Sequence, residues 1–347
     1  MEPGGRRRSV RGCSPHRRQW VGEVVPEVRR VSQGARWVVT LTVFASLLAS
    51  CSIPGTADHE TRPARTANGS ATPSGDTAAR PPSPLRATPD ETLGELPPVP
   101  ATDDAAALAS QLDHATATIR ERDAETTEVR QAAEFQQLAV RSLATASAAF
   151  RRGVTSRLDH ETALIVRSSV RAARSLRSLG EPQQQLPRWR IVAPPPAKEL
   201  LGYYREAQRR TGVSWTYLAA INLVETRMGR IRGVSTAGAR GPMQFLPSTW
   251  ELYGNDGDIT DPRDAILAAA RLLKAHGAPR GMADALWHYN PSESYVRAVR
   301  EYAVAMQRSR SAYRAFWHWR VFYRYARGTY VLPVGYPKTR AVPLPGS

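Results

Sequence analysis

The chain has 347 residues and a formal net charge of +17, and its 27 prolines gather in particular stretches. This length exceeds one average domain, but proline-rich parts add little to a core, so we expect one catalytic domain with accessory segments. The basic balance permits nucleic acid, an anionic membrane surface or an anionic polymer as partner, and it excludes none of them until the location of the protein is known.

The first 50 residues have the composition of an export signal. Nine arginines stand against three glutamates, ahead of an uncharged apolar stretch at residues 37–50. This stretch is shorter than the roughly 20 apolar residues that a spanning helix needs, so we expect a signal peptide at residues 1–50 and no transmembrane anchor. Export also argues against nucleic acid as a partner, because a DNA-binding role would require the cytoplasm.

The uncharged stretch ends at Leu48-Ala49-Ser50-Cys51. This tetrapeptide resembles the lipobox of bacterial lipoproteins, in which the cysteine is lipidated and becomes the first residue of the mature chain. The resemblance implies that Cys51 anchors the protein to the membrane through a lipid, on the outer face of the cytoplasmic membrane or in the cell envelope. The alternative is that Cys51 is an ordinary buried thiol.

Two regions follow the signal. Residues 51–102 consist mainly of Pro, Thr, Ala, Ser and Gly, with too few large apolar side chains to offset the entropy of ordering, which predicts a disordered tether. Residues 103–182 repeat leucine and isoleucine at helical intervals, which predicts two or three helices in a helical hairpin or short coiled coil, with Gly153 between one helix and the next. This helical region is interpreted as a packing unit. A spacer or partner-docking role is the alternative, and the sequence identifies no protein partner.

A compact segment at residues 198–307 follows a proline-rich linker. Ser214 is placed to cap a helix, and Glu225 lies on the apolar face of that helix. Burial of a carboxyl group raises its pKa toward the range that a general acid requires. An ion pair of Glu225 with Arg227, Arg230 or a remote arginine is the alternative. The predicted apolar stripe consists of Leu218, Ile221, Glu225 and Met228.

The turn that follows this helix combines Gly238 and Gly241 with Gln244, Phe245 and Trp250. Planar aromatic rings cover the apolar faces of sugars, while amides and hydroxyls bind the ring substituents. The combination favours sugar binding, although glycine and aromatic residues are also common in protein cores.

Three motifs occur in order in the segment: Glu225-Thr226-Arg227-Met228, the run from Ser235 to Gln244, and Tyr289-Asn290. Together they resemble the signature of the lytic transglycosylases with a lysozyme-like fold. The runs at residues 241–250, 261–270 and 289–296 further resemble the membrane-bound lytic transglycosylase B branch. The resemblance implies a mainly α, lysozyme-like catalytic domain at residues 198–307 that binds peptidoglycan glycan strands and needs no cofactor.

The same resemblance implies roles for individual residues. Glu225 would be the acid/base catalyst, cleaving the β-1,4 bond between N-acetylmuramic acid and N-acetylglucosamine without water and leaving a 1,6-anhydro ring. Pro242 and Trp287-His288 depart from the wider family and leave the subsite preference open. His288 is interpreted as a residue that packs or makes a surface hydrogen bond, without a catalytic role. The residues implied to line the glycan site are Ser235, Met243, Gln244, Tyr289 and Asn290.

Two other functions stay open. A hydrolytic muramidase would need a second carboxylate, such as Asp256 or Asp258, to activate water. A non-catalytic peptidoglycan-binding lipoprotein would need no acid. Together with Asp261 and Asp264, these aspartates lack the regular alternation and the late glutamate of a calcium loop, so no metal site is predicted.

The last region, residues 308–347, is a basic and aromatic extension. Six arginines from Arg308 to Arg327 alternate with aromatic side chains, and no acidic residue interrupts them. We expect a helix that packs on the catalytic domain by its aromatic face. Contact with anionic wall polymer or lipid head groups is the alternative.

Overall fold

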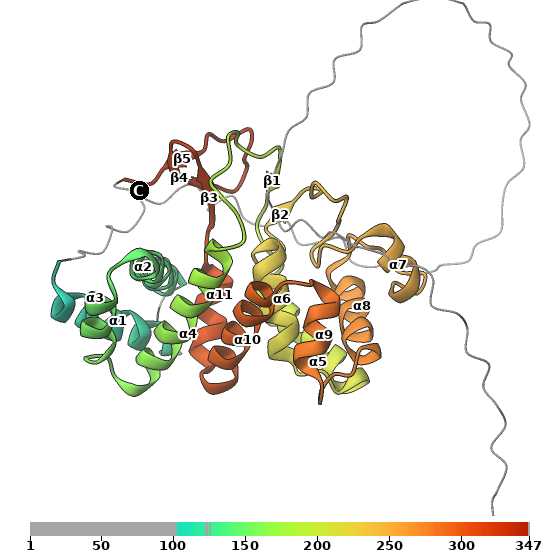
Figure 1. Ribbon diagram of the computed structural model, residues 1–347, viewed down its shortest axis with the longest axis horizontal. Coiled ribbons are helices and arrows are strands. Elements are labelled where there is room, and N and C mark those ends of the chain that lie inside the picture. The colour runs from blue at the N-terminus through green and yellow to red at the C-terminus, as the bar shows by residue number, and fades with distance from the viewer. Residues whose placement is uncertain (1–102, 122–123, 125, 346–347) are drawn as a thin grey trace, which may run out of the picture. The chain divides into compact units, whose positions relative to one another are not determined.

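The structure is a computed structural model that describes residues 103–121, 124 and 126–345 (Figure 1). The signal peptide at residues 1–50, the lipidation of Cys51 and the tether at residues 51–102 therefore lie outside the described residues. Within the described part of the chain, none of the helices is both long and apolar enough to cross a membrane.

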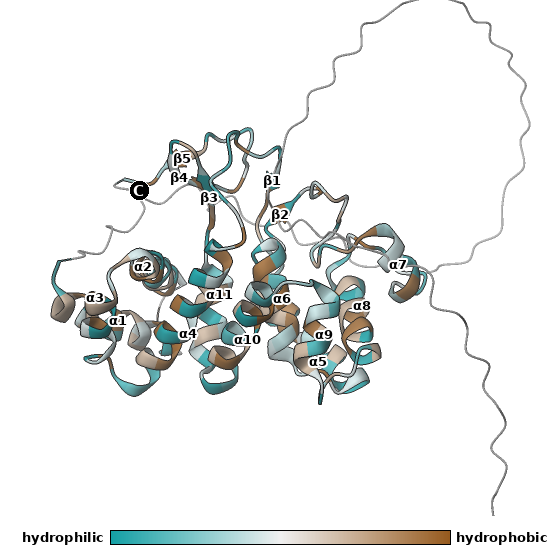
Figure 2. Cartoon of the chain, viewed as in Figure 1, coloured by the Kyte–Doolittle hydropathy of each residue, from teal (hydrophilic) through white to brown (hydrophobic). Residues whose placement is uncertain are grey.

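The described part is mainly α, which confirms the predicted fold class. Figure 2 shows that the helices carry hydrophobic and hydrophilic residues on different sides, as expected of helices that share a core. The helices are α1 (Ala105–Arg120), α2 (Thr126–Thr145), α3 (Ala148–Thr155), α4 (His160–Arg177), α5 (Ala197–Thr211), α6 (Trp215–Thr226), α7 (Pro247–Tyr253), α8 (Pro262–Ala275), α9 (Met282–Tyr289), α10 (Glu293–Arg308) and α11 (Arg310–His318).

The described residues of the helical region form four helices, α1 to α4, and not two or three. The prediction that Gly153 separates two helices is wrong, because Gly153 lies inside α3. The helix starts are set by side-chain caps instead: the Ser147 hydroxyl accepts from the Phe150 amide, and the Asp159 carboxylate accepts from the Thr162 amide at 2.6 Å. These caps satisfy backbone N–H groups that a helix start leaves without partners.

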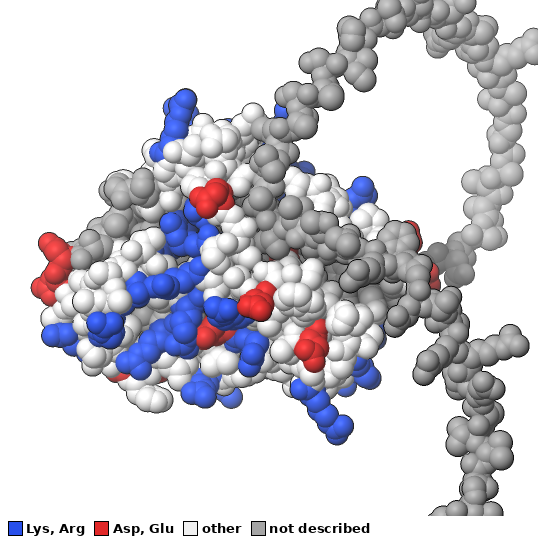
Figure 3. All heavy atoms as spheres, in the orientation of Figure 1, with Lys and Arg blue, Asp and Glu red and all other residues white. Residues whose placement is uncertain are grey.

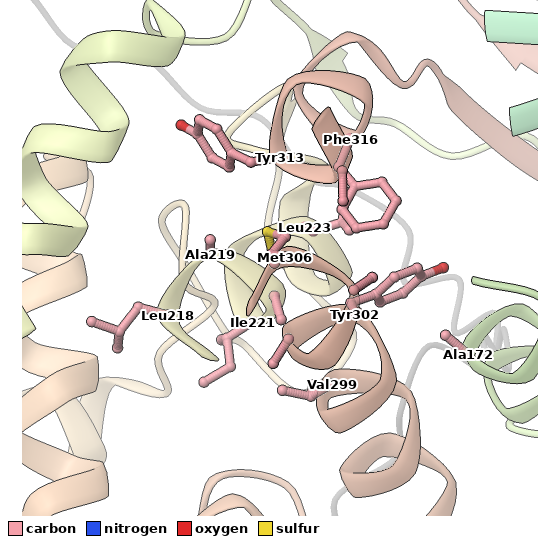
Figure 4. Packing of buried hydrophobic residues seen from close by; sticks show 14 of the residues in the cluster. Ala172, Leu218, Ala219, Ile221, Leu223, Val299, Tyr302, Met306, Tyr313 and Phe316 are labelled. Atoms are coloured by element: carbon pink, nitrogen blue, oxygen red, sulfur yellow. The ribbon is translucent and has the colours of Figure 1, made fainter. Parts of the chain in front are cut away.

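One hydrophobic core joins this helical region to the segment at residues 198–307. Helix α10 packs most extensively against α4 and then against α6, and the buried side chains of all three belong to the same cluster. Figure 4 shows Ile221 of α6 near Val299 of α10, with Ala172 of α4 beside Tyr302. The helical region therefore supports the central helices directly.

The C-terminal extension begins as predicted and then departs from the prediction. Helix α11 buries the aromatic side chains Tyr313 and Phe316 in the main core, but it packs more extensively against α2 of the helical region than against α10 of the expected catalytic domain. The residues after Trp319 form strands, because alternate side chains such as Val321 and Tyr323 are buried and Gly328 adopts a positive φ of 120° between the strands.

The strands build two small antiparallel sheets. In the first, β1 (Arg190–Ile191) pairs with β2 (Ile231–Arg232), so the proline-rich linker is tied to the segment after α6. In the second, β3 (Val321–Tyr325) pairs with β4 (Gly328–Leu332), which also pairs with β5 (Val342–Pro343). A second apolar cluster joins these strands through Ile191, Val321, Tyr323, Leu332, Tyr336 and Ala341.

Candidate active site

Glu225 lies in the last turn of α6. Ser214 occupies the predicted N-cap position, but its hydroxyl pairs with that of Thr216 and does not cap the helix. Leu218 and Ile221 are fully buried as predicted, whereas the side chain of Glu225 keeps partial access to solvent. Glu225 is thus the point where the buried face of α6 reaches the surface.

The backbone leaves α6 directly after Glu225 through an unusual turn. Arg227 and Met228 have positive φ values of 54° and 60°, which L-amino acids with a Cβ seldom adopt, and Gly229 continues with 82°. The Met228 amide donates to the Asn222 carbonyl at 3.1 Å, which ends the helix. Such strained backbone persists only where the surrounding contacts enforce it.

A buried hydrogen-bond network supplies those contacts. Asn222 Nδ2 and Thr226 Oγ1 both donate to the Pro242 carbonyl, at 2.8 and 2.6 Å, and Tyr204 donates from its hydroxyl to Asn222 Oδ1 at 2.6 Å. Pro242 is buried and has no N–H that would need a partner there. These hydrogen bonds connect the end of α6 to the glycine-rich turn that contains Pro242.

Tyr295 at the start of α10 is the hydrogen-bond partner of Glu225. Its hydroxyl donates to Glu225 Oε1 at 2.7 Å, and its ring lies parallel to that of Tyr289, with centroids 6.4 Å apart. Tyr289 in turn donates from its hydroxyl to the Met243 carbonyl at 2.6 Å. Among the described residues, Glu225 forms no ion pair with Arg227 or another basic side chain, so the ion-pair alternative finds no support.

Burial raises the pKa of Glu225 from 4.5 to about 7. The hydrogen bond from Tyr295 acts in the opposite direction, since it stabilises the ionised carboxylate. The C-terminal end of a helix carries partial negative charge, which also disfavours a carboxylate in the last turn of α6. At neutral pH Glu225 is therefore divided between its acid and base forms, which suits a group that both donates and accepts a proton.

Three of the other predicted site residues lie in the glycine-rich turn, and the remaining two lie at the end of α9. Ser235 and Gln244 build the glycine-rich turn: the Ser235 hydroxyl accepts from the Ala239 amide at 3.0 Å, and Gln244 Nε2 donates to the Gly241 carbonyl at 3.0 Å. The side chain of Met243 is fully buried in the core, and Met243 reaches the site through its carbonyl alone.

Tyr289 and Asn290 lie at the end of α9. Asn290 is buried, and its Oδ1 atom has no hydrogen-bond partner within the described residues. A buried acceptor without a partner costs free energy unless a ligand or water completes it. The Oδ1 atom of Asn290 is therefore an unused acceptor beneath the surface of the site.

Aromatic rings extend from this site. Phe245 makes edge contacts with Tyr289 and with Trp250, at centroid distances of 5.9 and 5.5 Å. His288 is exposed, and its ring stacks on that of His276 with centroids 4.0 Å apart. Trp287 is 45% exposed, an unusual exposure for its size.

The aspartates between α7 and α8 shape the loop in which they lie. Asp258 Oδ1 accepts from the amide and hydroxyl of Thr260, which lowers its pKa, and Asp261 caps α8 by accepting from the Asp264 amide. The loop contacts the glycine-rich turn, since a Cβ at Gly241 would lie 1.8 Å from the Ile259 carbonyl oxygen. The described residues contain no cluster of three or more His, Cys, Asp or Glu side chains suited to a metal ion.

The sequence reasoning did not assign roles to Tyr295, Asn222 and Thr226. Tyr295 is separated from Glu225 by 70 positions, and only the fold brings them together. Asn222 lies three positions before Glu225 and Thr226 lies next to it. A polar residue at these positions of an otherwise apolar helix was the available signal for the buried network.

The fold and the site define a mainly α-helical protein with a half-buried carboxyl group of raised pKa beside two stacked tyrosines. Residues 202–309, from within α5 to the end of α10, match the family model described as the transglycosylase SLT domain. No curated protein and no solved structure matches the chain. The family match supports lytic transglycosylase activity on peptidoglycan for this part of the chain.

Proposed function

We propose that the protein is a peptidoglycan lytic transglycosylase of the membrane-bound lytic transglycosylase B branch. It cleaves the β-1,4 bond between N-acetylmuramic acid and N-acetylglucosamine and leaves a 1,6-anhydro-N-acetylmuramic acid end. The observation that carries the proposal is the half-buried Glu225, whose pKa is raised to about 7 inside the segment that matches the family. The branch assignment rests on the motifs at residues 241–250, 261–270 and 289–296.

In the first step, protonated Glu225 donates its proton to the glycosidic oxygen as the bond to the anomeric carbon breaks. The hydroxyl of Tyr295 keeps its hydrogen bond to Glu225 Oε1 and stabilises the carboxylate that forms. The acetamido group of the muramyl residue helps to stabilise the developing positive charge, as the family resemblance implies. The N-acetylglucosamine fragment then leaves with the proton.

In the second step, the Glu225 carboxylate accepts the proton of the muramyl 6-hydroxyl. The 6-oxygen attacks the anomeric carbon of the same sugar and closes the 1,6-anhydro ring. Glu225 is protonated again, so the cycle needs neither water nor a second protein carboxylate. A group with a pKa near neutrality performs both proton transfers without a large free-energy penalty.

The two rival functions are less well supported. A hydrolytic muramidase would use a second carboxylate to activate water, but Asp258 already accepts two hydrogen bonds from Thr260 and Asp256 is exposed. A purely binding lipoprotein would gain nothing from holding Glu225 in surroundings that raise its pKa. Both rivals are outcomes of the experiment that follows.

The test is digestion of purified peptidoglycan by the full chain, with mass spectrometry of the products. We expect fragments one water lighter than hydrolysis products, and we expect Glu225→Gln to lose about 10²-fold or more of the rate. The matched control is Glu128→Gln, which removes an exposed glutamate from α2 and should leave the rate unchanged. Hydrated ends would establish a muramidase, and an unchanged digestion by Glu225→Gln would establish a non-catalytic binding protein.

We further propose that the protein is exported and anchored by a lipid on Cys51. The support is the basic leader, the short apolar stretch and the tetrapeptide ending at Cys51. Metabolic labelling with a fatty-acid analogue should mark the full chain and should fail to mark Cys51→Ser. Labelling that persists in this variant would contradict the assignment.

A further inference from the structure

A shallow depression lies on the helical region, and its α4 side ends next to Ser178, whose hydroxyl pairs with that of Ser294 in α10 at 3.0 Å. The depression has a volume of about 370 Å³ and is formed where α2 ends, α3 passes and α4 ends. Figure 3 shows Lys and Arg side chains gathered over the face to which α2 and α4 contribute. The residues that line the depression are Ala144, Thr145, Ala146, Arg151, Arg174 and Arg177.

The three arginines reach this depression from two helices. Arg174 and Arg177 lie in the last turn of α4, and three-residue spacing places them on adjacent positions of one helix face. Arg151 comes from α3, and its Nη1 atom donates to the Ala146 carbonyl at the end of α2. Arg151 is thereby held in place, while Arg174 and Arg177 are exposed at the rim.

The positive charge of this depression has no acidic partner among the described residues. None of the described ion pairs involves Arg151, Arg174 or Arg177. Burial, followed by the neighbouring charges of Arg174 and Arg152, lowers the pKa of Arg151. Like charges that lower each other's proton affinity are stabilised when an anion binds between them.

The surroundings add further positive charge. Arg324 of β3 donates to the carbonyls of Arg177 and Gly180, and its charge contributes, after burial, to the lowered pKa of Arg177. Behind them, Arg141 of α2 stacks over the ring of Phe322 at 4.4 Å, and its Nε atom is buried without a partner in the described part of the chain.

Helix α4 also contains an arginine whose charge is balanced by a carboxylate. Arg171, one turn before Arg174, donates two hydrogen bonds to the carboxylate of Glu301 in α10, at 2.6 and 2.8 Å. Basic residues in the last turn also complement the helix dipole, but that dipole amounts to only about half an elementary charge. The dipole alone therefore does not balance the two arginines at the end of α4.

We propose that this arginine depression binds the phosphate group of an anionic ligand. Guanidinium groups present paired N–H donors that match the oxygens of phosphate, and a phosphate can accept from several of them at once. The ligand is either a soluble phosphate compound or the head group of an anionic phospholipid. This proposal is independent of the reaction at Glu225.

The test measures binding of pyrophosphate to the full chain by isothermal titration calorimetry. Arg174→Gln/Arg177→Gln should weaken binding at least tenfold. The matched control is Arg205→Gln/Arg209→Gln, which removes the same charge from the surface of α5 and should change binding less than twofold. Absence of binding to the unaltered chain, or equal weakening by both double variants, would overturn the proposal.

A second variant separates a built site from simple positive charge. Arg174→Lys/Arg177→Lys keeps the net charge but removes the paired donors, so we expect clearly weaker binding. Full affinity in this variant would overturn the proposal. Thermal unfolding followed by circular dichroism should show that all variants are folded, because the substituted side chains are exposed.

Two further arms distinguish the sources of the phosphate. Vesicles of phosphatidylcholine with phosphatidylglycerol should sediment with the chain in a manner that depends on Arg174 and Arg177 if the ligand is a lipid head group. If the ligand is a soluble phosphate compound, soluble polyphosphate should displace pyrophosphate from the unaltered chain, and this displacement should depend on Arg174 and Arg177. Dependence in either arm supports the site, and its absence from both would overturn it.

Discussion

The helices α1–α4 and the segment from α5 to α10 share one core but use buried polar groups differently. In α2, buried polar side chains contact the C-terminal extension. Glu134 forms an ion pair with Arg320 at 2.6 Å, and the Gln137 side chain donates to the Arg320 carbonyl and accepts from the Arg320 amide. In the segment from α5 to α10, buried polar side chains gather behind Glu225. The first arrangement joins parts of the chain that are distant in sequence, and the second fixes one carboxyl group.

The largest expected effect comes from separating the two regions. Residues 198–307 alone would expose the face of α10 that α4 covers, together with the ring of Trp215 in α6, which contacts Tyr313 of α11. We expect no cooperative thermal unfolding and no peptidoglycan digestion by this fragment, whereas residues 103–347 should retain both. A sharp unfolding transition of residues 198–307, followed by circular dichroism, would show that the helical region is dispensable.

The next effect concerns the link between α2 and the C-terminal extension. Arg320→Met would leave the carboxyl group of Glu134, which is 5% exposed, buried without its counter-charge, and we expect a loss of about 3 to 5 kcal/mol in the free energy of unfolding. The control is Arg171→Met, which breaks a more exposed pair with Glu301 and should cost about 1 kcal/mol or less. Urea unfolding at neutral pH measures both. Equal losses would mean that the buried pair adds nothing special.

The sequence predicted the parts of this molecule that depend on local pattern. The apolar stripe identified the helix of Glu225, and the motif order identified the segment that the family model matches. Tyr295 was missed because its contact with Glu225 depends on how α10 packs against α6. Gly153 was misinterpreted because Ser147 and Asp159 determine where the helices begin. The strands β3 and β4 were missed because the basic and aromatic extension was interpreted as one helix, and the run from Val321 to Tyr325 does not alternate between apolar and polar residues.

A third prediction sharpens the description of the site by comparing two glycines of one turn. Gly238 and Gly241 both have positive φ, but a Cβ at Gly238 meets nothing within 4 Å, whereas at Gly241 it would lie 1.8 Å from the Ile259 carbonyl oxygen. We expect Gly238→Ala to cost about 1 to 2 kcal/mol and Gly241→Ala about 3 kcal/mol or more. Chemical unfolding measures the two losses. Gly241→Ala should also lower digestion, and equal effects would mean that the loop contact is not needed.

A fourth prediction concerns the stability that the site gives up. The folded state keeps Glu225 protonated up to a pKa of about 7, whereas the unfolded chain releases this proton near 4.5. The favourable contribution of protonated Glu225 to the free energy of unfolding is complete below pH 4.5, and it is lost as the pH rises through 7. The shift corresponds to about 3 kcal/mol, which partial exposure reduces to about 2.

Glu225→Gln should therefore unfold with nearly the same free energy as the unaltered chain at pH 4. At pH 8 the variant should be more stable by about 2 kcal/mol, because the amide does not ionise. Urea unfolding across this pH range measures the difference. If the difference in unfolding free energy between Glu225→Gln and the unaltered chain did not change with pH, the raised pKa of Glu225 would be contradicted. The contrast between helices α1–α4, which support the fold, and the segment from α5 to α10, which holds Glu225, would then be weaker.

The smallest effect isolates a single hydroxyl. A general acid must be protonated to act, so digestion should decline as the pH rises through about 7. Tyr295→Phe keeps the ring but removes the donor that stabilises the carboxylate, which should move this decline upward by about 1 pH unit. Tyr289→Phe is the matched control: it loses the bond to the Met243 carbonyl, so it should lower the rate without moving the decline. A downward shift in Tyr295→Phe would mean that this hydroxyl stabilises the protonated acid, and the two proton transfers would then need a different partner.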